Sequence, residues 1–359
     1  STRIDITNVI CSTGNRECYT SLMPSNPTYP LSVAPMMGCT DRHCRYLLRL
    51  VSPNALLYSE MVTSGALLHG SANHFLRHEE DAPCVFQLGG SNPTELSECA
   101  ERVEAAGYQA VNLNVGCPSD RVQSAGIGAC LMATPETVAN CVSAMAQRVN
   151  IPVSVKCRIG IDQEPTYAEF RDFIHQVYDG GCRSFSVHAR IAVLSGLSPK
   201  QNREIPPLHY DFVYRIKDDF PDAQFSLNGG IKTHEDALME CQRVGAVMIG
   251  RAVYNNPFLL AQLDASLFGS TPPDHYKVWL NYRDHIASEL AAGENLKHSA
   301  RHLLGLFSGL RGARAFRRNL GEHIYIDGAG LDMIDETLET SGVLSAIKSS
   351  PSSAQRVIG

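Results

Sequence analysis

The sequence contains no long apolar run. Its longest apolar stretches have only the length of a β-strand, whereas a helix that crosses a bilayer needs roughly 20 apolar residues. Residues 1–30 mix polar residues with prolines and lack the continuous apolar core of a secretory signal. We therefore expect no membrane-spanning helix and interpret residues 1–30 as an N-terminal extension, which leaves open the remnant of an organellar transit peptide.

Paired cysteine motifs are also missing. The chain has 12 cysteines, yet no two of them stand in a CxxC spacing, and they are scattered through predicted strands and helices. This distribution favours reduced thiols in a cytoplasmic compartment over a disulfide framework. Cys39, His43 and Cys44 lie close together in the sequence, but no second cluster completes a set of metal ligands, so we expect no metal site.

An excess of positive charge is absent as well. The chain has 31 Lys and Arg against 37 Asp and Glu, which gives a net charge of −6. Such a chain has no global attraction for nucleic acid, so any RNA-binding surface must be local. Its 359 residues and 44% hydrophobic content, by contrast, suffice for a large folded core.

The sequence does contain a repeated alternation of short apolar runs and helical segments. Helix start signals follow several of the runs, such as Thr40-Asp41 and Asn92-Pro93-Thr94. Eight such units predict an α/β fold, a (β/α)8 TIM barrel. A doubly wound open sheet is the alternative, although Pro35-Met36-Met37-Gly38 stands where its GxGxxG motif is expected. The predicted strands are residues 31–34, 55–58, 84–88, 110–114, 152–156, 184–188, 224–228 and 246–249.

The composition changes after Gly269, where a Ser-, Thr- and Pro-containing linker leads into two or three predicted amphipathic helices without strand patterns. We therefore divide the chain into an N-terminal extension (1–30), a barrel (31–269), an all-helical C-terminal domain (270–321) and a C-terminal tail (322–359). Residues 295–320 contain no Asp or Glu. This block favours a surface for a polyanion over an ordinary solvated helix face, and its cations are Lys297, Arg301, Arg311, Arg314, Arg317 and Arg318.

Polar residues and glycines stand at the ends of most predicted strands. The active site of a TIM barrel forms at the carboxyl ends of its strands, and its phosphate site lies after strands 7 and 8. Gly229-Gly230 and Gly250-Arg251 occupy those two positions and predict a phosphate-binding cradle.

Three polar side chains on other strands suggest what the phosphate belongs to. Gln87, Lys156 and His188 would together suit a flat heterocycle with donors and acceptors, which favours flavin mononucleotide (FMN). Taken singly, Lys156 fits an interior ion pair and His188 fits a core histidine with satisfied hydrogen bonds, so these alternatives stay open.

Cys117 is the cysteine that stands out. It follows the fourth predicted strand between Gly116 and Pro118, in a rigid turn on the expected active-site face. A thiol with an ordinary pKa near 8.5 is mostly protonated at neutral pH. Both a general acid and an activated nucleophile are compatible with this position.

Motifs over roughly residues 31–320 carry a family resemblance. They are VAPM and TDRHCRYLLR (33–49), LYSEMVTSGALLHG (57–70), QLGGS (87–91), NLNVGCPSDRVQ with GACLM (112–132), VKCRIGID (155–162), VHAR with LSGLSPKQNREIPPL (187–208), NGGIK (228–232) and, directly after Gly250, RAVYNNP (251–257). With these motifs the chain closely resembles the tRNA-dihydrouridine synthases, in particular their bacterial A-type subfamily. The resemblance implies a flavoprotein that reduces the C5=C6 bond of uridines in the tRNA D-loop, with NADPH as reductant and a C-terminal helical domain that helps to bind tRNA. We also expect the protein to be cytoplasmic and monomeric.

The resemblance also implies roles for individual residues. Cys117 takes the position of the proton donor, and Asn114 is expected to bind the uracil edge. FMN contacts are expected at Pro35, Met36, Met37, Gln87, Lys156, His188, Asn228, Gly229, Gly230, Gly250 and Arg251. Contacts to tRNA are expected at Arg190, Lys200, Arg203, Lys297, Arg301, Arg311, Arg314 and Arg318.

Two other functions compete with this interpretation. One is an FMN-dependent TIM-barrel reductase of a small pyrimidine or enone, which needs the same flavin site but no RNA surface. The other is a flavin-free RNA-binding protein on an inactive barrel, which the set of Gln87, Cys117, Lys156 and His188 disfavours.

Overall fold

The structure, a computed structural model, describes residues 29–78, 80–326 and 328–349. The first 28 residues, which hold nearly all of the expected N-terminal extension, lie outside this description. Eight parallel strands form one sheet in the order β1-β8-β7-β6-β5-β4-β3-β2. Their bounds are β1 (Leu31–Val33), β2 (Leu57–Thr63), β3 (Cys84–Gly89), β4 (Ala110–Val115), β5 (Val153–Cys157), β6 (Ser184–His188), β7 (Gln224–Asn228) and β8 (Val247–Ile249).

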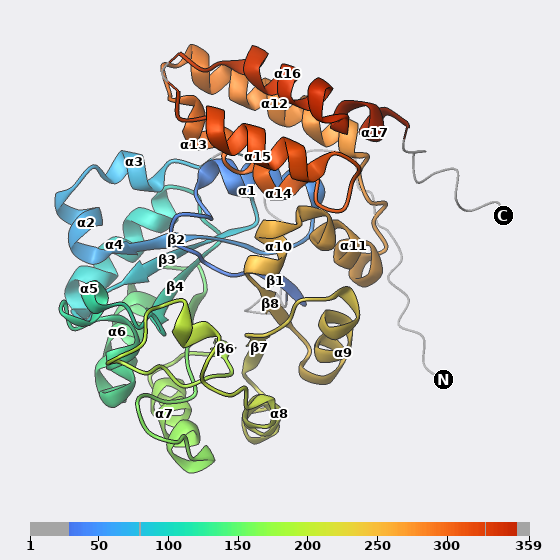
Figure 1. Ribbon diagram of the computed structural model, residues 1–359. Coiled ribbons are helices and arrows are strands. Elements are labelled where there is room, and N and C mark those ends of the chain that lie inside the picture. Colours follow the sequence, from blue (N-terminus) through green and yellow to red (C-terminus); the bar gives the residue numbers. More distant parts are fainter. Residues whose placement is uncertain (1–28, 79, 327, 350–359) are drawn as a thin grey trace, which may run out of the picture.

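The sheet closes on itself between β1 and the start of β2. The Val33 N–H donates to the Leu56 carbonyl at 2.9 Å, and the Leu56 N–H donates to the Leu31 carbonyl at 3.0 Å. Together with the parallel bridge between Ser32 and Leu56, these bonds complete the barrel. The predicted (β/α)8 fold is therefore confirmed, and the open-sheet alternative is wrong (Figure 1).

Helices on the outside of the barrel begin where the sequence signals predicted. Asp41 caps the first of them by accepting a hydrogen bond from the Cys44 N–H at 2.9 Å, and Asn92 and Thr233 cap two others. The covering helices are α1 (Arg42–Val51), α4 (Pro93–Ala105), α6 (Pro135–Arg148), α7 (Tyr167–Asp179), α8 (Tyr210–Asp219), α9 (His234–Val244) and α11 (Pro257–Phe268). Shorter helices in the loops are α2 (Ser64–His69), α3 (Ala72–Leu76), α5 (Asp120–Gln123) and α10 (Arg251–Asn255), with 3-10 turns η1 (Gly128–Ala133) and η2 (Gln201–Arg203).

The main core lies between the sheet and these helices, and the barrel interior is more polar. Seven of the ten cysteines in the described residues are buried, and all ten are free thiols. Inside the barrel a small apolar cluster of Ala34, Tyr58, Val85 and Met248 shares the space with buried hydroxyl and amide groups. No helix of the described residues combines the length and hydropathy that a bilayer-crossing helix needs.

The C-terminal domain packs as a layer of helices against one side of the barrel (Figure 1). It consists of α12 (His275–Ala291), α13 (Leu296–Ala300), α14 (Leu303–Leu306), α15 (Ala313–His323), α16 (Leu331–Ser341) and α17 (Val343–Ser349). The prediction of a tail from residue 322 is wrong for α16 and α17. Ile334, Leu338, Val343 and Ile347 are all at most 1% exposed, so these helices bury an apolar face against the domain.

Candidate active site

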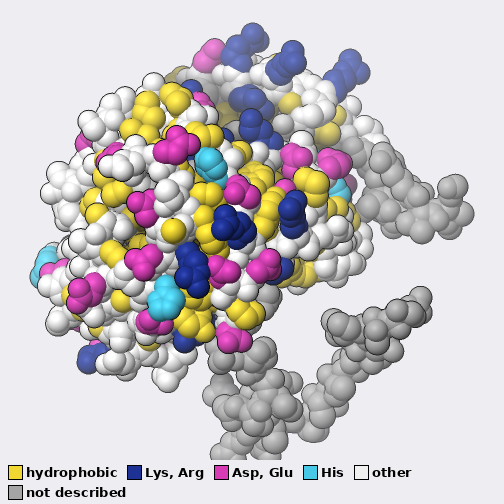
Figure 2. Space-filling view, turned by 90° about the horizontal axis from the view of Figure 1, so that it is seen from below, with side chains coloured by type: hydrophobic (Ala, Val, Ile, Leu, Met, Phe, Trp, Pro, Cys, Tyr) yellow, Lys and Arg dark blue, Asp and Glu magenta, His cyan; other side chains and the backbone are white. Residues whose placement is uncertain are grey.

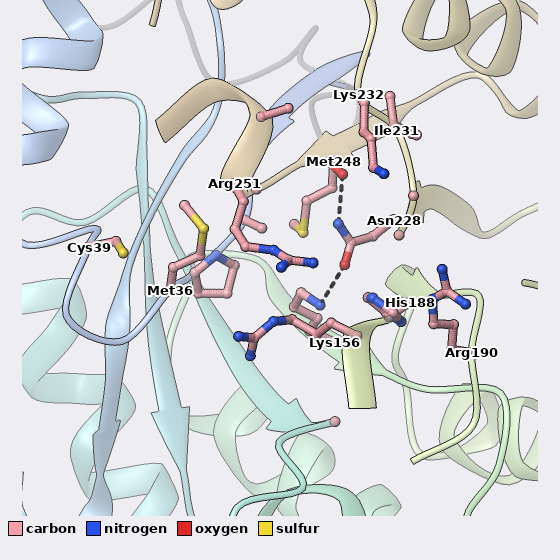
Figure 3. A pocket seen from close by; sticks show the side chains of 18 of the residues that line it. Met36, Cys39, Lys156, His188, Arg190, Asn228, Ile231, Lys232, Met248 and Arg251 are labelled. Atoms are coloured by element: carbon pink, nitrogen blue, oxygen red, sulfur yellow. Dashed lines mark hydrogen bonds between the residues drawn. The ribbon is translucent and has the colours of Figure 1, made fainter. Parts of the chain in front are cut away.

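A cavity of about 1180 Å³ opens at the carboxyl ends of the barrel strands. Its walls come from loops after strands around the whole barrel, as expected for an active site in this fold (Figure 3). It brings together most residues that the sequence singled out: Pro35, Met36, Met37, Gln87, Asn114, Cys117, Lys156, His188, Arg190, Arg203, Asn228, Gly229, Gly230, Gly250 and Arg251. The other predicted contacts lie outside its walls, and they are Lys200, Lys297, Arg301, Arg311, Arg314 and Arg318.

A chain of side-chain amides crosses the cavity floor between β3 and β4. The Gln87 Nε2 donates to the Asn112 Oδ1 at 2.8 Å, and the Asn114 Nδ2 donates to the Gln87 Oε1 at 2.9 Å. Asn112 in turn donates to the Ser154 hydroxyl at 2.9 Å. Because all of these groups are buried, each amide fixes the orientation of the next, and Gln87 is held rigidly at the wall.

The Cys117 loop is shaped by the same network. The Asn114 Oδ1 accepts hydrogen bonds from the Gly116 N–H at 3.1 Å and the Cys117 N–H at 3.0 Å. Behind the loop, the Ala129 N–H donates to the Cys117 carbonyl at 2.9 Å, and the thiol lies 3.5 Å from the Ser119 hydroxyl. Asn114 therefore holds the backbone of Cys117, a role that the sequence did not reveal.

Lys156 is a partly buried cation without an acidic partner among the described residues. Its Nζ donates to the Asn228 Oδ1 at 3.1 Å, and Asn228 donates onward to the Met248 carbonyl at 2.7 Å (Figure 3). Burial, reinforced by repulsion from Arg158, lowers the pKa of Lys156 to about 8. The interior ion pair considered from the sequence is thus not formed, and the site favours a ligand that carries negative charge.

His188 is likewise left incomplete. Burial and then the charges of Arg158 and Lys156 lower its pKa well below the usual value, so the ring is neutral at physiological pH. Its Nδ1 is buried and has no hydrogen-bond partner among the described residues. Because an unpaired buried polar atom costs about 1–3 kcal/mol, this atom points to a bound ligand rather than to a satisfied core histidine.

The glycine cradle after β7 and β8 has the shape that an anion needs. Gly229 and Gly230 adopt φ values of 107° and 77°, which residues with a side chain rarely adopt. A Cβ added to Gly230 would lie 2.5 Å from Leu208 Cδ1 and 2.9 Å from the Tyr210 hydroxyl, so no larger residue fits. Across the cradle, Arg251 Nη1 lies 2.8 Å from Glu204 Oε1, and the Arg251 side chain is half-exposed at the cavity.

Arg158 is a site residue to which the sequence analysis gave no role. It is only 4% exposed and donates from Nε to the Gly116 carbonyl at 3.2 Å. Its Nη1 donates to the carbonyls of Ile191 at 3.1 Å and Asn202 at 2.9 Å. The guanidinium therefore joins the Cys117 loop to residues 191–203. The available signal was its spacing of two from Lys156, which puts Arg158, one residue beyond the end of β5, at the same cavity as that lysine.

The basic residues of the C-terminal domain separate into two groups. Arg311, Arg314, Arg317 and Arg318 are exposed on or beside α15, and Figure 2 shows Lys and Arg side chains gathered at one edge of the molecule. Arg301 departs from the predicted basic face, because its guanidinium forms an ion pair with Asp41 of the barrel. The sequence could not show this partner, which lies 260 positions away.

Comparison with known proteins extends over both the barrel and the helical domain. The family model described as dihydrouridine synthase matches residues 32–339. The chain is 55% identical over 308 residues to the tRNA-dihydrouridine(20/20a) synthase of Pseudomonas syringae pv. tomato, covering 85% of this chain and 92% of that protein. Proteins with the same name from Escherichia coli and Vibrio cholerae are 51% and 50% identical; the alignments cover 87% and 86% of this chain, and 96% and 95% of those proteins.

Proposed function

The chain belongs to the dihydrouridine synthase family, and from this premise we propose that it reduces uridines of the tRNA D-loop to dihydrouridine. The family identified from the sequence motifs is thereby confirmed, and with it the class of oxidoreductase. We further propose FMN as the resident cofactor and NADPH as the reductant. Because the relatives' names specify positions 20 and 20a, uridines at these positions are the proposed substrates.

The observation that carries the proposed cofactor is a set of incompletely paired polar groups beside a glycine cradle. The cradle of Gly229 and Gly230, with Arg251 opposite, suits the phosphate of FMN. Lys156 and the free Nδ1 of His188 suit the polar edges of the ring. When bound there, FMN supplies the hydride that reduces the uracil C5=C6 bond.

The chain's own chemical contribution is the proton. The thiol of Cys117 stands at the cavity, on a loop fixed by Asn114 and Arg158, and donates its proton to C5 of the uracil. A positioned general acid typically contributes 10²–10⁴-fold to a rate. Asn114 stays the predicted contact for the uracil edge, and Lys156 offsets negative charge at the cavity floor.

The RNA is proposed to reach the cavity over two surfaces. The target base must leave its stack to enter the cavity, and its position in a tRNA loop lowers that cost. Arg190, Lys200 and Arg203, in the segment after β6, would hold the RNA beside the opening, and the exposed arginines of α15 would hold it farther away. This division explains how a chain of net charge −6 binds a polyanion.

The test of the proposed function is a single-turnover experiment. The protein is reduced with NADPH under anaerobic conditions, and flavin absorbance is followed after unmodified tRNA or free uridine is added. Rapid reoxidation by tRNA alone is the expected result. If free uridine reoxidises the flavin and tRNA has no effect, a reductase of a free pyrimidine or enone is favoured. A protein that contains no flavin would refute the proposed cofactor.

Replacing Arg314 and Arg318 together with glutamine should raise the apparent KM for tRNA and flatten its salt dependence. Each lost phosphate contact lowers the slope of log K against log salt by about 1. The matched control replaces Arg148 and Arg171, two exposed arginines on α6 and α7 that pair with acidic residues of the barrel. An equal change in both double variants would show that net charge, rather than α15, sets the affinity.

A further inference from the structure

The helical domain contacts the β1–α1 loop through a shared carboxylate. Asp41 follows the turn that begins at Met36, and the Thr40 N–H donates to the Met36 carbonyl at 3.0 Å. The Asp41 Oδ1 lies 2.9 Å from the His302 Nε2, and the same carboxylate forms an ion pair with Arg301. Two neighbouring residues of the helical domain therefore hold the base of the loop that carries Met36 and Met37, two of the proposed flavin contacts.

The same part of the helical domain contacts the end of α10. The His302 ring lies within hydrogen-bond distance of the Tyr254 hydroxyl, with Nδ1 3.3 Å from it. A Cβ added to Gly305 would lie 2.4 Å from the Tyr254 carbonyl oxygen, so the backbones of α14 and α10 are in direct contact. Tyr254 is three residues beyond Arg251, one turn along the helix whose start forms the phosphate cradle.

We propose that Asp41, Arg301, His302 and Tyr254 form a positioning network through which the helical domain fixes two of the loops that bind the flavin. The network joins the β1–α1 loop to α10, and His302 is 2% exposed and contacts both. It rests on the proposed function, since it concerns affinity for FMN. The helical domain is then part of the cofactor site as well as a surface for RNA.

The network also lies beside the proposed RNA surface. The Arg317 Nε of α15 donates to the Leu304 carbonyl at 3.0 Å, one residue before Gly305. The helix that carries Arg314 and Arg318 is thus bound to α14, which rests on α10. RNA held by α15 would accordingly keep a fixed position relative to the flavin loops.

The experiment compares Arg301→Met with Arg283→Met in the full-length protein. Both arginines belong to the helical domain, both pair with an aspartate, and both side chains are 33% exposed. The partner of Arg301 lies in the barrel, whereas Asp335, the partner of Arg283, lies in α16 of the same domain. The dissociation constant of FMN is measured by flavin fluorescence after the cofactor is removed, and thermal unfolding is recorded in parallel.

We expect Arg301→Met to raise the dissociation constant of FMN about tenfold, a typical coupling between distinct sites. Arg283→Met should leave it within about twofold. Excess FMN should restore most of the turnover of Arg301→Met, because the variant weakens cofactor binding and leaves the chemical groups in place. Gly305→Ala, which pushes α14 away from α10, should weaken FMN binding through a different contact.

Several outcomes would overturn the inference. Unchanged FMN affinity in both Arg301→Met and Gly305→Ala would show that the helical domain does not position the flavin loops. An equal loss of FMN affinity in Arg301→Met and Arg283→Met would indicate general destabilisation of the domain. A wild-type protein that binds no FMN would refute the proposed cofactor and this inference with it. Among the outcomes of this experiment, it alone counts against the proposed function.

Discussion

Cys117→Ala is expected to keep its FMN and to lose about 10²–10⁴-fold of its turnover with tRNA, the usual contribution of a general acid. The proposed flavin contacts lie on other strands, and the loop should keep its shape, because Asn114 binds the backbone N–H of Cys117 rather than its thiol. The variant therefore removes the proposed proton donor with little other change. The measurement is the single-turnover rate of flavin reoxidation by tRNA, together with the amount of flavin bound.

Cys130 provides the matched control. It is also a partly buried thiol, in η1 beside the Cys117 loop, but its thiol donates to the Ile127 carbonyl and it does not line the cavity. Cys130→Ala should turn over at nearly the wild-type rate. Arg251→Ala should show the opposite defect from Cys117→Ala, with weakened FMN binding. Equal loss of flavin in Cys117→Ala and Arg251→Ala would contradict the roles assigned to both residues.

The barrel was predictable because its strands are local features of the sequence. β6 and β7 have the predicted bounds, since each is a short segment between turn signals in which two buried apolar residues alternate with polar ones. The placing of Lys156 and His188 at one cavity followed from the fold, because the carboxyl ends of all strands in a TIM barrel face the same way.

The remaining features depend on contacts between distant segments. Arg301 was assigned to an exposed basic face because its partner, Asp41, is unrelated to it in sequence. The buried face of α16 and α17 was hidden in a segment rich in Ser, Thr and acidic residues, and it becomes recognisable only against α12 and α15. Asn114 and Arg158 act through hydrogen bonds to backbone groups, and the sequence does not show which backbone groups these side chains reach.

Lys156 makes the stability of the FMN-free protein depend on pH. Its pKa is lowered from 10.5 to about 8, chiefly by burial. Between these values the unfolded chain binds a proton that the folded chain has released, so this group makes stability rise with pH. The free-energy cost of burying the charged lysine lowers stability in full below pH 8 and is absent above pH 10.5. Its size is on the order of 3 kcal/mol.

Lys156→Met should therefore stabilise the FMN-free protein at pH 7 and remove the rise in stability between pH 8 and 10.5. The affinity of the wild-type protein for reduced FMN should change with pH in the opposite direction. Above pH 8 the wild-type protein must take up a proton before Lys156 can pair with the negative edge of reduced FMN, so its affinity should fall by up to about tenfold per pH unit. Lys156→Met should bind reduced FMN weakly at every pH, without this dependence.

Two titrations check the prediction for Lys156. Urea unfolding of the FMN-free protein at about pH 7 and 9.5, on either side of the folded-state pKa, measures the stability term, and anaerobic titration with reduced FMN at the same pH values measures the binding term. Lys277→Met, at an exposed lysine of α12, is the control and should behave as the wild type in both. If the wild type and Lys156→Met show the same pH dependence, the Lys156 cation does not recognise the flavin, and the negative charge of the ligand must be held elsewhere in the cavity.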